Sequence, residues 1–301
     1  MTGRRRVGRL SFSAHEHLRW PDMARPSAPS RRTYPPGPLL AAEARYAKDS
    51  ARPLHILAFL LPLVVLYELG LVLFLSSPDG AFRETILAHK TLDRFFSQFG
   101  ATKFYLPGIA LVVVLLIWHV AKREPWKVRF SVLAGMAAES VLWMLPLLVL
   151  GMVLSMDLTR GVSGGGGGAG AVVPVAMAVA GGEAAESWQA KVTLSIGAGL
   201  YEELLFRLVL VTGLHFVTFD LIRMKEPSAS IIAVAGGAIA FAVYHNVSFM
   251  NDPVSASAFY VVAGLYFGLV FMLRGFGVVV GCHAAYDLMA LVIIPILRAK
   301  G

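Results

Sequence analysis

The sequence predicts an all-α fold, a polytopic bundle of about seven helices that cross a membrane. Of its 301 residues, 56% are hydrophobic and only 15% are charged, whereas about a quarter of the residues in a soluble domain are charged. Seven apolar windows recur along the chain, and each is about long enough to cross a hydrocarbon core of roughly 30 Å as a helix. These windows are Leu54–Leu75, Leu106–Val120, Phe130–Met156, Lys191–Phe216, Ile231–Met250, Ala256–Leu273 and Phe276–Leu297.

Residues 1–53 precede the first window and have a different composition. They are rich in Arg, Pro and Ser, and they hold 11 of the 27 Lys and Arg residues. This composition predicts a disordered, basic arm. No hydrophobic region follows the early arginines, so we do not expect a cleaved secretion signal, and Met23 is an alternative start. A cytoplasmic basic arm accounts for much of the net charge of +8, which therefore does not indicate a nucleic-acid partner.

The windows divide the remaining chain into three parts. Residues 54–156 are expected to hold the first three membrane helices, with an amphipathic surface helix within Ser76–Lys103. Residues 157–189 contain the run Gly164–Gly168 and an apolar stretch too short to span, so they are expected to form a flexible loop. Residues 190–301 form the last four spans. The single cysteine, Cys282, excludes an internal disulfide and is read as a small packing residue.

Charge in the short loops predicts the orientation of the bundle. Basic residues cluster after the second, fourth and sixth windows, whereas the loop at Asn251 and Asp252 has none. Because cytoplasmic loops carry an excess of Lys and Arg, the amino terminus is expected in the cytoplasm. The basic loop residues are Lys122, Arg123, Lys127, Arg129, Arg223, Lys225 and Arg274.

Ionisable residues intrude into three of the apolar windows. Glu202, Glu203 and Arg207 lie together in the fourth window, His245 lies in the fifth, and His283 is followed by Asp287 in the seventh. An uncompensated charge inside a bilayer costs several kcal/mol, about 2.5–3.5 on insertion scales, so such residues need partners and a purpose. Three helices are therefore expected to converge on one titratable centre, which is the outline of an active site inside a membrane.

Helical spacing assigns these residues to faces. Glu203 and Arg207 are four residues apart, so they share a face and are expected to neutralise each other, which leaves Glu202 available for chemistry. His283 and Asp287 are also one turn apart. Phe241 stands one turn from His245, where its ring could exclude lipid.

Together, Glu202-Glu203-Leu-Leu-Phe-Arg207, Phe241-Ala-Val-Tyr-His245 and His283-Ala-Ala-Tyr-Asp287 resemble the three motifs of the CAAX-protease and bacteriocin-processing family of intramembrane proteases. Those motifs are EExxxR, FxxxH and HxxxN or HxxxD, and the resemblance covers about a third of the chain. By resemblance to the type II CAAX prenyl endopeptidases, Glu202 is expected to act as general base with His245 assisting. His283 and Asp287 are expected to line the oxyanion site. The resemblance also implies a bacterial inner membrane and a membrane-anchored protein or peptide substrate.

Asp287 departs from the well-characterised CAAX enzymes, which have Asn there. An ionised aspartate cannot donate a hydrogen bond, so Asp287 must be protonated, must orient His283, or must bind a cation. No cofactor is expected to be required. A divalent metal such as zinc nevertheless stays open, since a set of nitrogen and oxygen ligands is present in Glu202, Glu203, His245 and His283.

Two other functional classes are compatible with the sequence, and the roles of several further residues are undecided. A proton-coupled transporter also uses intramembrane Glu and His, although no convincing internal repeat supports it. A non-catalytic bacteriocin-immunity or chaperone protein on the same scaffold would be expected to lack a motif residue. His119 and His215, near predicted span ends, are expected to be structural. For two further intramembrane acids, a role supporting the site and a plain interhelical hydrogen bond are equally compatible with the sequence; these are Glu68 and Glu139.

Overall fold

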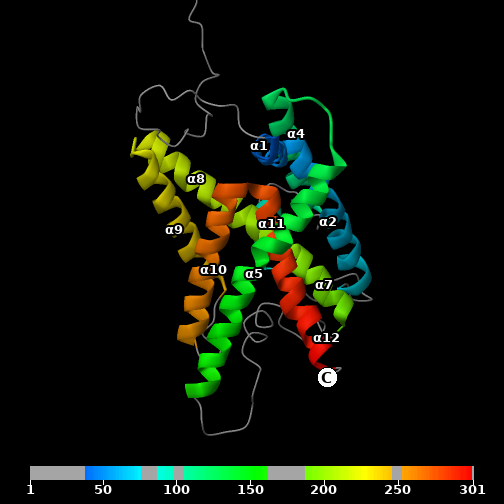
Figure 1. Ribbon diagram of the computed structural model, residues 1–301, viewed down its shortest axis with the longest axis vertical. Coiled ribbons are helices and arrows are strands. Elements are labelled where there is room, and N and C mark those ends of the chain that lie inside the picture. Colours follow the sequence, from blue (N-terminus) through cyan, green and yellow to red (C-terminus); the bar gives the residue numbers. More distant parts are fainter. Residues whose placement is uncertain (1–37, 76–86, 98–104, 162–186, 246–252, 300–301) are drawn as a thin grey trace, which may run out of the picture. The chain divides into compact units, whose positions relative to one another are not determined.

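The computed structural model describes residues 38–75, 87–97, 105–161, 187–245 and 253–299 (Figure 1). Its elements within these ranges are all helical, so the predicted all-α class is confirmed. The first helices are α1 (Pro38–Ser50), α2 (Pro53–Phe74), α3 (Leu87–Ser97), α4 (Leu106–Lys122) and α5 (Phe130–Gly161). They are followed by α7 (Trp188–Gly197), η2 (Ala198–Glu202), η3 (Leu204–Val211), α8 (Thr212–His215), η4 (Phe216–Leu221), α9 (Glu226–Tyr244), α10 (Pro253–Arg274), α11 (Phe276–Leu288), η5 (Met289–Ile293) and α12 (Ile294–Ala299).

Six helices in the described part of the chain are long and apolar enough to cross a membrane, and α4 is a shorter apolar helix of 17 residues. These seven correspond to the seven windows of the sequence. Large apolar side chains face outward from them, among them Leu142 on α5 and Ile239 and Val243 on α9. Outward-facing apolar side chains combined with buried charged ones are the arrangement expected when the solvent is lipid. The chain is an integral membrane protein.

Local sequence explains where several helices begin and end. Proline occupies the first turn of α2, α4 and α9, where the missing N–H would have no intrahelical partner. At the start of α7 the Ser187 hydroxyl caps the helix by accepting a hydrogen bond from the Ala190 N–H at 3.1 Å. Gly275, with φ of 84°, allows the sharp turn that separates α10 from α11.

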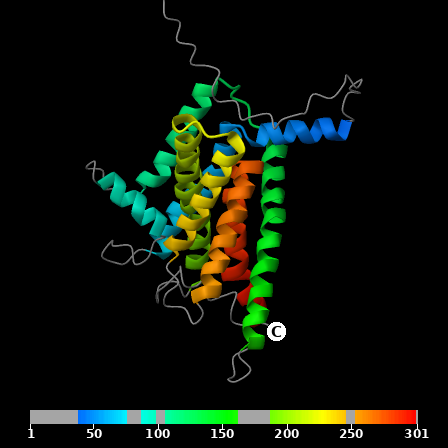
Figure 2. The same ribbon diagram turned by 90° about the vertical axis from the view of Figure 1, so that its left-hand side faces the viewer.

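The expected boundary of the amino-terminal arm is wrong. Residues 38–50, assigned above to the disordered arm, form helix α1, which lies across the bundle beside the amino end of α5 (Figure 2). The Tyr46 hydroxyl donates a 2.6 Å hydrogen bond to Glu139 on α5. The Pro- and Arg-rich composition concealed a helix that this contact joins to α5. Residues 1–37 lie outside the described part of the chain, so the prediction of disorder there stays a prediction.

The expected loops also differ in part from the structure. Helix α5 continues to Gly161, so the start of the predicted glycine-rich loop is helical, and the run Gly164–Gly168 lies outside the described residues. The expected surface helix within Ser76–Lys103 is described only as α3, in which Ala88 and His89 are buried. The fifth window was predicted to reach Met250, but α9 ends at Tyr244.

Helix α11 lies in the middle of the packed helices and is covered by α5, α7, η2 and α10. Its span, Phe276–Ala299, is the most buried of the six. Cys282 is fully buried there and makes no disulfide, as the packing role predicted for it requires. The helix that carries His283 and Asp287 is thus held on several sides by the helices that carry the other motif residues.

Candidate active site

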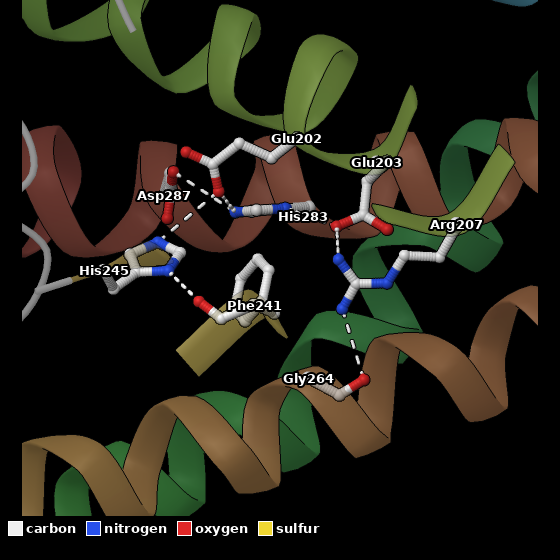
Figure 3. Close-up of polar contacts among 8 residues, drawn as sticks. All are labelled: Glu202, Glu203, Arg207, Phe241, His245, Gly264, His283 and Asp287. Atoms are coloured by element: carbon white, nitrogen blue, oxygen red, sulfur yellow. Dashed lines mark hydrogen bonds and ion pairs between the residues drawn. The ribbon is translucent and has the colours of Figure 1, made fainter. Parts of the chain in front are cut away.

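Three helical segments bring the predicted site residues together in a single centre (Figure 3). Glu202 comes from the end of η2, His245 from the carboxyl end of α9, and His283 and Asp287 from successive turns of α11. The Glu202 Oε2 atom lies 3.5 Å from His245 Nε2 and 3.9 Å from His283 Nε2. Asp287 Oδ2 lies 3.6 Å from His283 Nε2. The convergence expected from the three motifs is therefore present in the geometry.

The helix that carries the two glutamates has an unusual local structure. Residues Ala198–Glu202 and Leu204–Val211 are π-helical. The Thr212 hydroxyl donates to the Arg207 carbonyl five residues earlier, at 3.2 Å. π-helical turns are rare and occur often at functional sites.

A close approach at Gly199 places this helix against α11. A Cβ atom at this position would lie 2.7 Å from the Val280 carbonyl oxygen and 2.7 Å from both the backbone nitrogen and the Cβ of Ala284. Only glycine allows the two backbones to come this near. Gly199 lies in the same π-helical turn as Glu202, three residues before it, and Ala284 directly follows His283, so the contact helps set the distance between acid and imidazole.

Glu203 makes two strong contacts and Glu202 makes none of comparable length. The Arg207 guanidinium donates to Glu203 Oε1 at 2.9 Å, and His283 Nδ1 lies 2.7 Å from the same oxygen. Arg207 also donates to the Gly264 carbonyl at 3.2 Å. Its guanidinium lies over the rings of Phe241 and Phe267, with its carbon 4.6 and 5.3 Å from their centroids. The Glu203–Arg207 pairing expected from spacing is present, and it extends to His283.

Both histidine rings are held by aromatic neighbours that the motifs did not indicate. Tyr260 stacks on His245 with ring centroids 4.0 Å apart, and Phe267 stacks on His283 at 4.5 Å. Tyr260 and Phe267 are seven residues apart on α10, which places them on one helix face. That spacing is the signal in the sequence that could have identified them. Phe241 lies against His245 at 4.4 Å, as its place one turn earlier suggested.

Glu202 is buried with an unsatisfied carboxylate. Its exposed fraction is 1%, and neither carboxylate oxygen has a hydrogen-bond partner within the described chain. A small cavity of about 30 Å³ adjoins it, lined by Glu202, His245, His283 and Asp287 and by apolar residues from α5 and α10. A water needs about 10–15 Å³ of such space, so the cavity has room for about two waters.

Only some of the four predicted metal ligands are free to bind a metal ion in this structure. Glu203 is engaged by Arg207 and His283, so three of the four candidates, Glu202, His245 and His283, still face the cavity. Within the described ranges, no three or more His, Cys, Asp or Glu side chains form an arrangement that could hold a metal ion.

The other polar residues singled out in the sequence lie away from this centre. Glu139 accepts hydrogen bonds from Tyr46, from Trp143 and, in a bidentate contact, from Arg274. Burial and the bond to Glu139 raise the pKa of Tyr46, which lies in α1 outside the spans. Glu139 is therefore a structural tie between α1, α5 and α10. His215 pairs with Glu226 at 3.0 Å.

His119 lies in the last turn of α4. The sequence predicted a structural role near a span end, and the ring is buried, with an exposed fraction of 1%, and packs edge-on against Trp126 at 4.4 Å. Glu68, the last of the singled-out residues, accepts a hydrogen bond from the Tyr201 hydroxyl at 2.9 Å. Its bond ties α2 to the residue that precedes Glu202.

The fold and the site define a polytopic membrane protein with a buried glutamate and histidine centre. Residues 185–289, which contain all three motifs, match the family model described as Type II CAAX prenyl endopeptidase Rce1-like. This match covers about a third of the chain, and it agrees with the resemblance seen in the motifs. No curated protein and no solved structure matches the chain.

Proposed function

We propose that the chain is an intramembrane endopeptidase that cleaves a membrane-associated protein or peptide with a glutamate-activated water. The observation that carries this proposal is the difference between the adjacent glutamates. Glu203 is bonded to Arg207 and His283, whereas Glu202 is buried beside a water-sized cavity, and within the described residues its nearest basic atom is His245 Nε2 at 3.5 Å. The family match supports a peptidase.

Hydrogen bonds to the two histidines suggest their roles. His245 Nδ1 lies 2.7 Å from the Phe241 carbonyl oxygen, which can only accept, so Nδ1 carries the proton. In the neutral ring Nε2 is then an acceptor, and it faces Glu202 Oε2. A water in the adjoining cavity, hydrogen-bonded to both of these atoms, would give one proton to Glu202 and be oriented by His245, as general-base catalysis requires.

The opposite side of the cavity supplies the groups for the oxyanion. His283 Nδ1 faces Glu203 Oε1, which is also an acceptor, so the proton on Nδ1 is fixed in the same way. His283 Nε2 can then donate to a peptide carbonyl oxygen only when the ring is protonated on both nitrogens. Protonated Asp287 is the other donor available. In a site with little water, either donor would stabilise the developing negative charge strongly.

The mechanism that we propose needs no cofactor, because base and oxyanion donors come from the side chains themselves. The substrate would be a membrane-anchored protein or peptide, and no nucleic acid is required. We place the protein in a bacterial plasma membrane with its amino terminus in the cytoplasm. Exposed Lys122, Arg123 and Lys127 beside α4 support this orientation.

Replacement of Glu202 tests the function directly. Glu202→Gln keeps the shape of the side chain and removes the base, so cleavage should fall by about 10²- to 10⁴-fold while the protein stays folded. New amino termini of membrane proteins would be compared in cells that produce the wild type or the variant. The cleavage sites found would then be rebuilt as lipid-anchored peptides and assayed with purified protein in liposomes.

Glu43→Gln is the matched control, because Glu43 is exposed on α1 and far in sequence from the motifs. It should cleave at the wild-type rate. Equal cleavage by purified Glu202→Gln and wild type would remove Glu202 as the base. No difference in amino termini between wild-type and Glu202→Gln cells would count against peptidase activity on their membrane proteins.

A further inference from the structure

A second polar cluster lies on the other side of the helix that carries Glu202. Its centre is Tyr201, which is fully buried and donates a 2.9 Å hydrogen bond to Glu68 Oε1 on α2. The Tyr201 ring meets the rings of Tyr67 on α2 and His89 on α3 edge-on, both with centroids 5.0 Å away. Helices α2 and α3 therefore hold the residue that directly precedes the proposed base.

Helix α4 closes over the same hydrogen bond. A Cβ atom at Gly108 would lie 2.8 Å from Glu68 Oε1 and 3.2 Å from the Tyr201 hydroxyl oxygen, so glycine lets the α4 backbone pass directly beside both atoms. All of these contacts come from residues before 185, outside the segment that matches the protease family. The amino-terminal helices thus contact Tyr201 on the side of its helix that faces away from the cavity.

The local backbone gives this contact a consequence for Glu202. Residues Ala198–Glu202 form a π-helical turn, a local departure from α-helical geometry of a kind that often lies at functional sites. Gly199 packs on α11 on one side, and Tyr201 is bonded to Glu68 on the other. If the Tyr201 side were released, the turn could relax and change the direction of Glu202 relative to His245 and His283.

We infer that Glu68 and Tyr201 are positioning residues: their hydrogen bond fixes the π-helical turn that aims Glu202 into the cavity. That the bond affects cleavage rests on the proposed function. That the bond orients Glu202 does not depend on the function. Neither residue touches the cavity, so neither is expected to take part in the chemistry.

Tyr201→Phe is the first variant, since it keeps the ring and removes only the hydroxyl. We expect kcat to fall about 10- to 100-fold, the range expected when catalytic groups are misplaced by up to about 1 Å. KM should change little, because Tyr201 does not line the cavity. Glu68→Gln retains a carbonyl oxygen that can accept from Tyr201, so it should keep most of the wild-type kcat.

A loss of protein stability must be distinguished from a change in the orientation of the Glu202 side chain. Tyr201→Phe leaves a half-buried carboxylate without its donor, whereas removing both partners of a buried hydrogen bond is nearly neutral. The double variant Tyr201→Phe/Glu68→Leu should therefore recover the wild-type unfolding midpoint in detergent but keep the low kcat. Recovery of both together would show that the bond only stabilises the fold and would overturn the inference.

Tyr67→Phe is the matched control, because the Tyr67 hydroxyl belongs to the same cluster and has no hydrogen-bond partner in the described chain. It should leave kcat unchanged; a loss equal to that of Tyr201→Phe would overturn the inference, since the Tyr201–Glu68 bond would then not be the cause.

A second readout does not depend on cleavage. In protein labelled with ¹⁵N-histidine, the ring-nitrogen resonances of His245 and His283 should shift in the Tyr201→Phe/Glu68→Leu variant and stay in place in Tyr67→Phe. Unchanged resonances in the double variant would overturn the inference even if the wild type is a peptidase. If the wild type cleaves nothing, the proposed function fails, and these resonances still decide whether the cluster sets the geometry of the site.

Discussion

Two adjacent glutamates in one apolar helix, Glu202 and Glu203, have different chemical environments. Glu203 shares one oxygen between Arg207 and His283, so its charge is compensated inside the bundle. Glu202 is equally buried, yet its nearest basic atoms lie 3.5 and 3.9 Å away on the two histidines. Burying a carboxylate without hydrogen bonds is costly, and such a group is expected only where a substrate, a proton or a water completes it.

Arg207 is predicted to be essential for folding. Arg207→Ala leaves Glu203 as a buried acid without its cation, which should destabilise the protein by about 3–5 kcal/mol. The Phe241 and Phe267 rings would also lose the guanidinium that lies between them. Thermal unfolding and the yield of monodisperse protein in detergent would measure the effect.

The double variant Arg207→Met/Glu203→Gln separates charge from packing. It removes both charges and retains similar side-chain volumes, so it should recover much of the lost stability while leaving His283 without its carboxylate partner. If Arg207→Ala were as stable as the wild type, the ion pair would be dispensable and the structural role assigned to it would be wrong.

Substitutions of Asp287 test how the oxyanion is stabilised. If its carboxyl group donates a hydrogen bond, it must be protonated, and asparagine could donate in its place without titrating. Asp287→Asn should then keep most of the activity and hold it to higher pH than the wild type. Asp287→Ala should lose about 2.7–4 kcal/mol of transition-state stabilisation, the usual effect of one missing donor.

A pH–rate profile of the two Asp287 variants beside the wild type decides between the roles. An inactive but folded Asp287→Asn protein would rule out donation. It would indicate an ionised Asp287 that orients His283, whose Nε2 lies 3.6 Å away, or that binds a cation.

The motif spacing predicted the central residues well and their neighbours poorly. Pairs on one helix, such as Glu203 with Arg207, follow from a separation of four residues. Contacts between helices do not follow from spacing: the bond from His283 to Glu203 depends on how η2 packs on α11. The stacking of Tyr260 and Phe267 on the histidines depends on α10 in the same way.

At the scale of secondary-structure elements, the close packing of η2 against α11 determines the geometry of the site. The three atoms that a Cβ at Gly199 would meet at 2.7 Å include the backbone nitrogen of Ala284 and the carbonyl oxygen of Val280, which cannot rotate away. Gly199→Ala should therefore separate the helices, cost about 1–3 kcal/mol of stability and reduce cleavage. Unfolding in detergent and cleavage of the reconstituted substrate would be measured on the same preparation.

Gly213 provides a matched control for Gly199 on the same membrane span. A Cβ at Gly213 meets nothing within 4 Å, so Gly213→Ala should be neutral or slightly stabilising, since alanine is the better helix former. If Gly199→Ala were as active and stable as Gly213→Ala, the close approach would not control the geometry of the centre.

Apolar windows predicted the helices because hydrophobic length is a strong constraint in a bilayer. They could not predict the π-helical turns at 198–202 and 204–211, which depend on packing against α2, α9 and α11. Helix α1 was missed for a related reason. It has no apolar window, and its link to the bundle runs through single residues such as Tyr46.

At the scale of the whole molecule, the centre is assembled from both parts of the chain. The segment 185–289 supplies every motif residue, while Leu147 on α5 lines the cavity and Glu68 on α2 holds Tyr201. A fragment limited to the matched segment would lack these contacts. The predicted division into 54–156 and 190–301 therefore describes the order of helices along the chain and does not define two independent units.

Metal dependence is a property of the whole active protein, and it separates two mechanisms for the same residues. In the mechanism proposed here Glu202 takes a proton from water, so chelation should leave cleavage unchanged. In a metal mechanism Glu202, His245 and His283 would be ligands and would have to approach one ion to about 2.0–2.2 Å. Ligand atoms at that distance from one tetrahedral ion lie about 3.3–3.6 Å from each other, so the separations of 3.5 and 3.9 Å from Glu202 Oε2 to the two Nε2 atoms fit either mechanism, and chelation decides between them.

Elemental analysis of active, reconstituted protein before and after dialysis against a chelator makes the comparison, with cleavage measured at each step. We expect zinc well below one ion per chain and unchanged cleavage after chelation. Glu202→Gln serves as the internal reference: a bound zinc would fall with the loss of its ligand, whereas adventitious zinc would not. Stoichiometric zinc whose removal and return abolish and restore cleavage would overturn the metal-free mechanism, and it would make Glu203, which faces His283 Nδ1, the carboxylate that orients this ligand toward the ion.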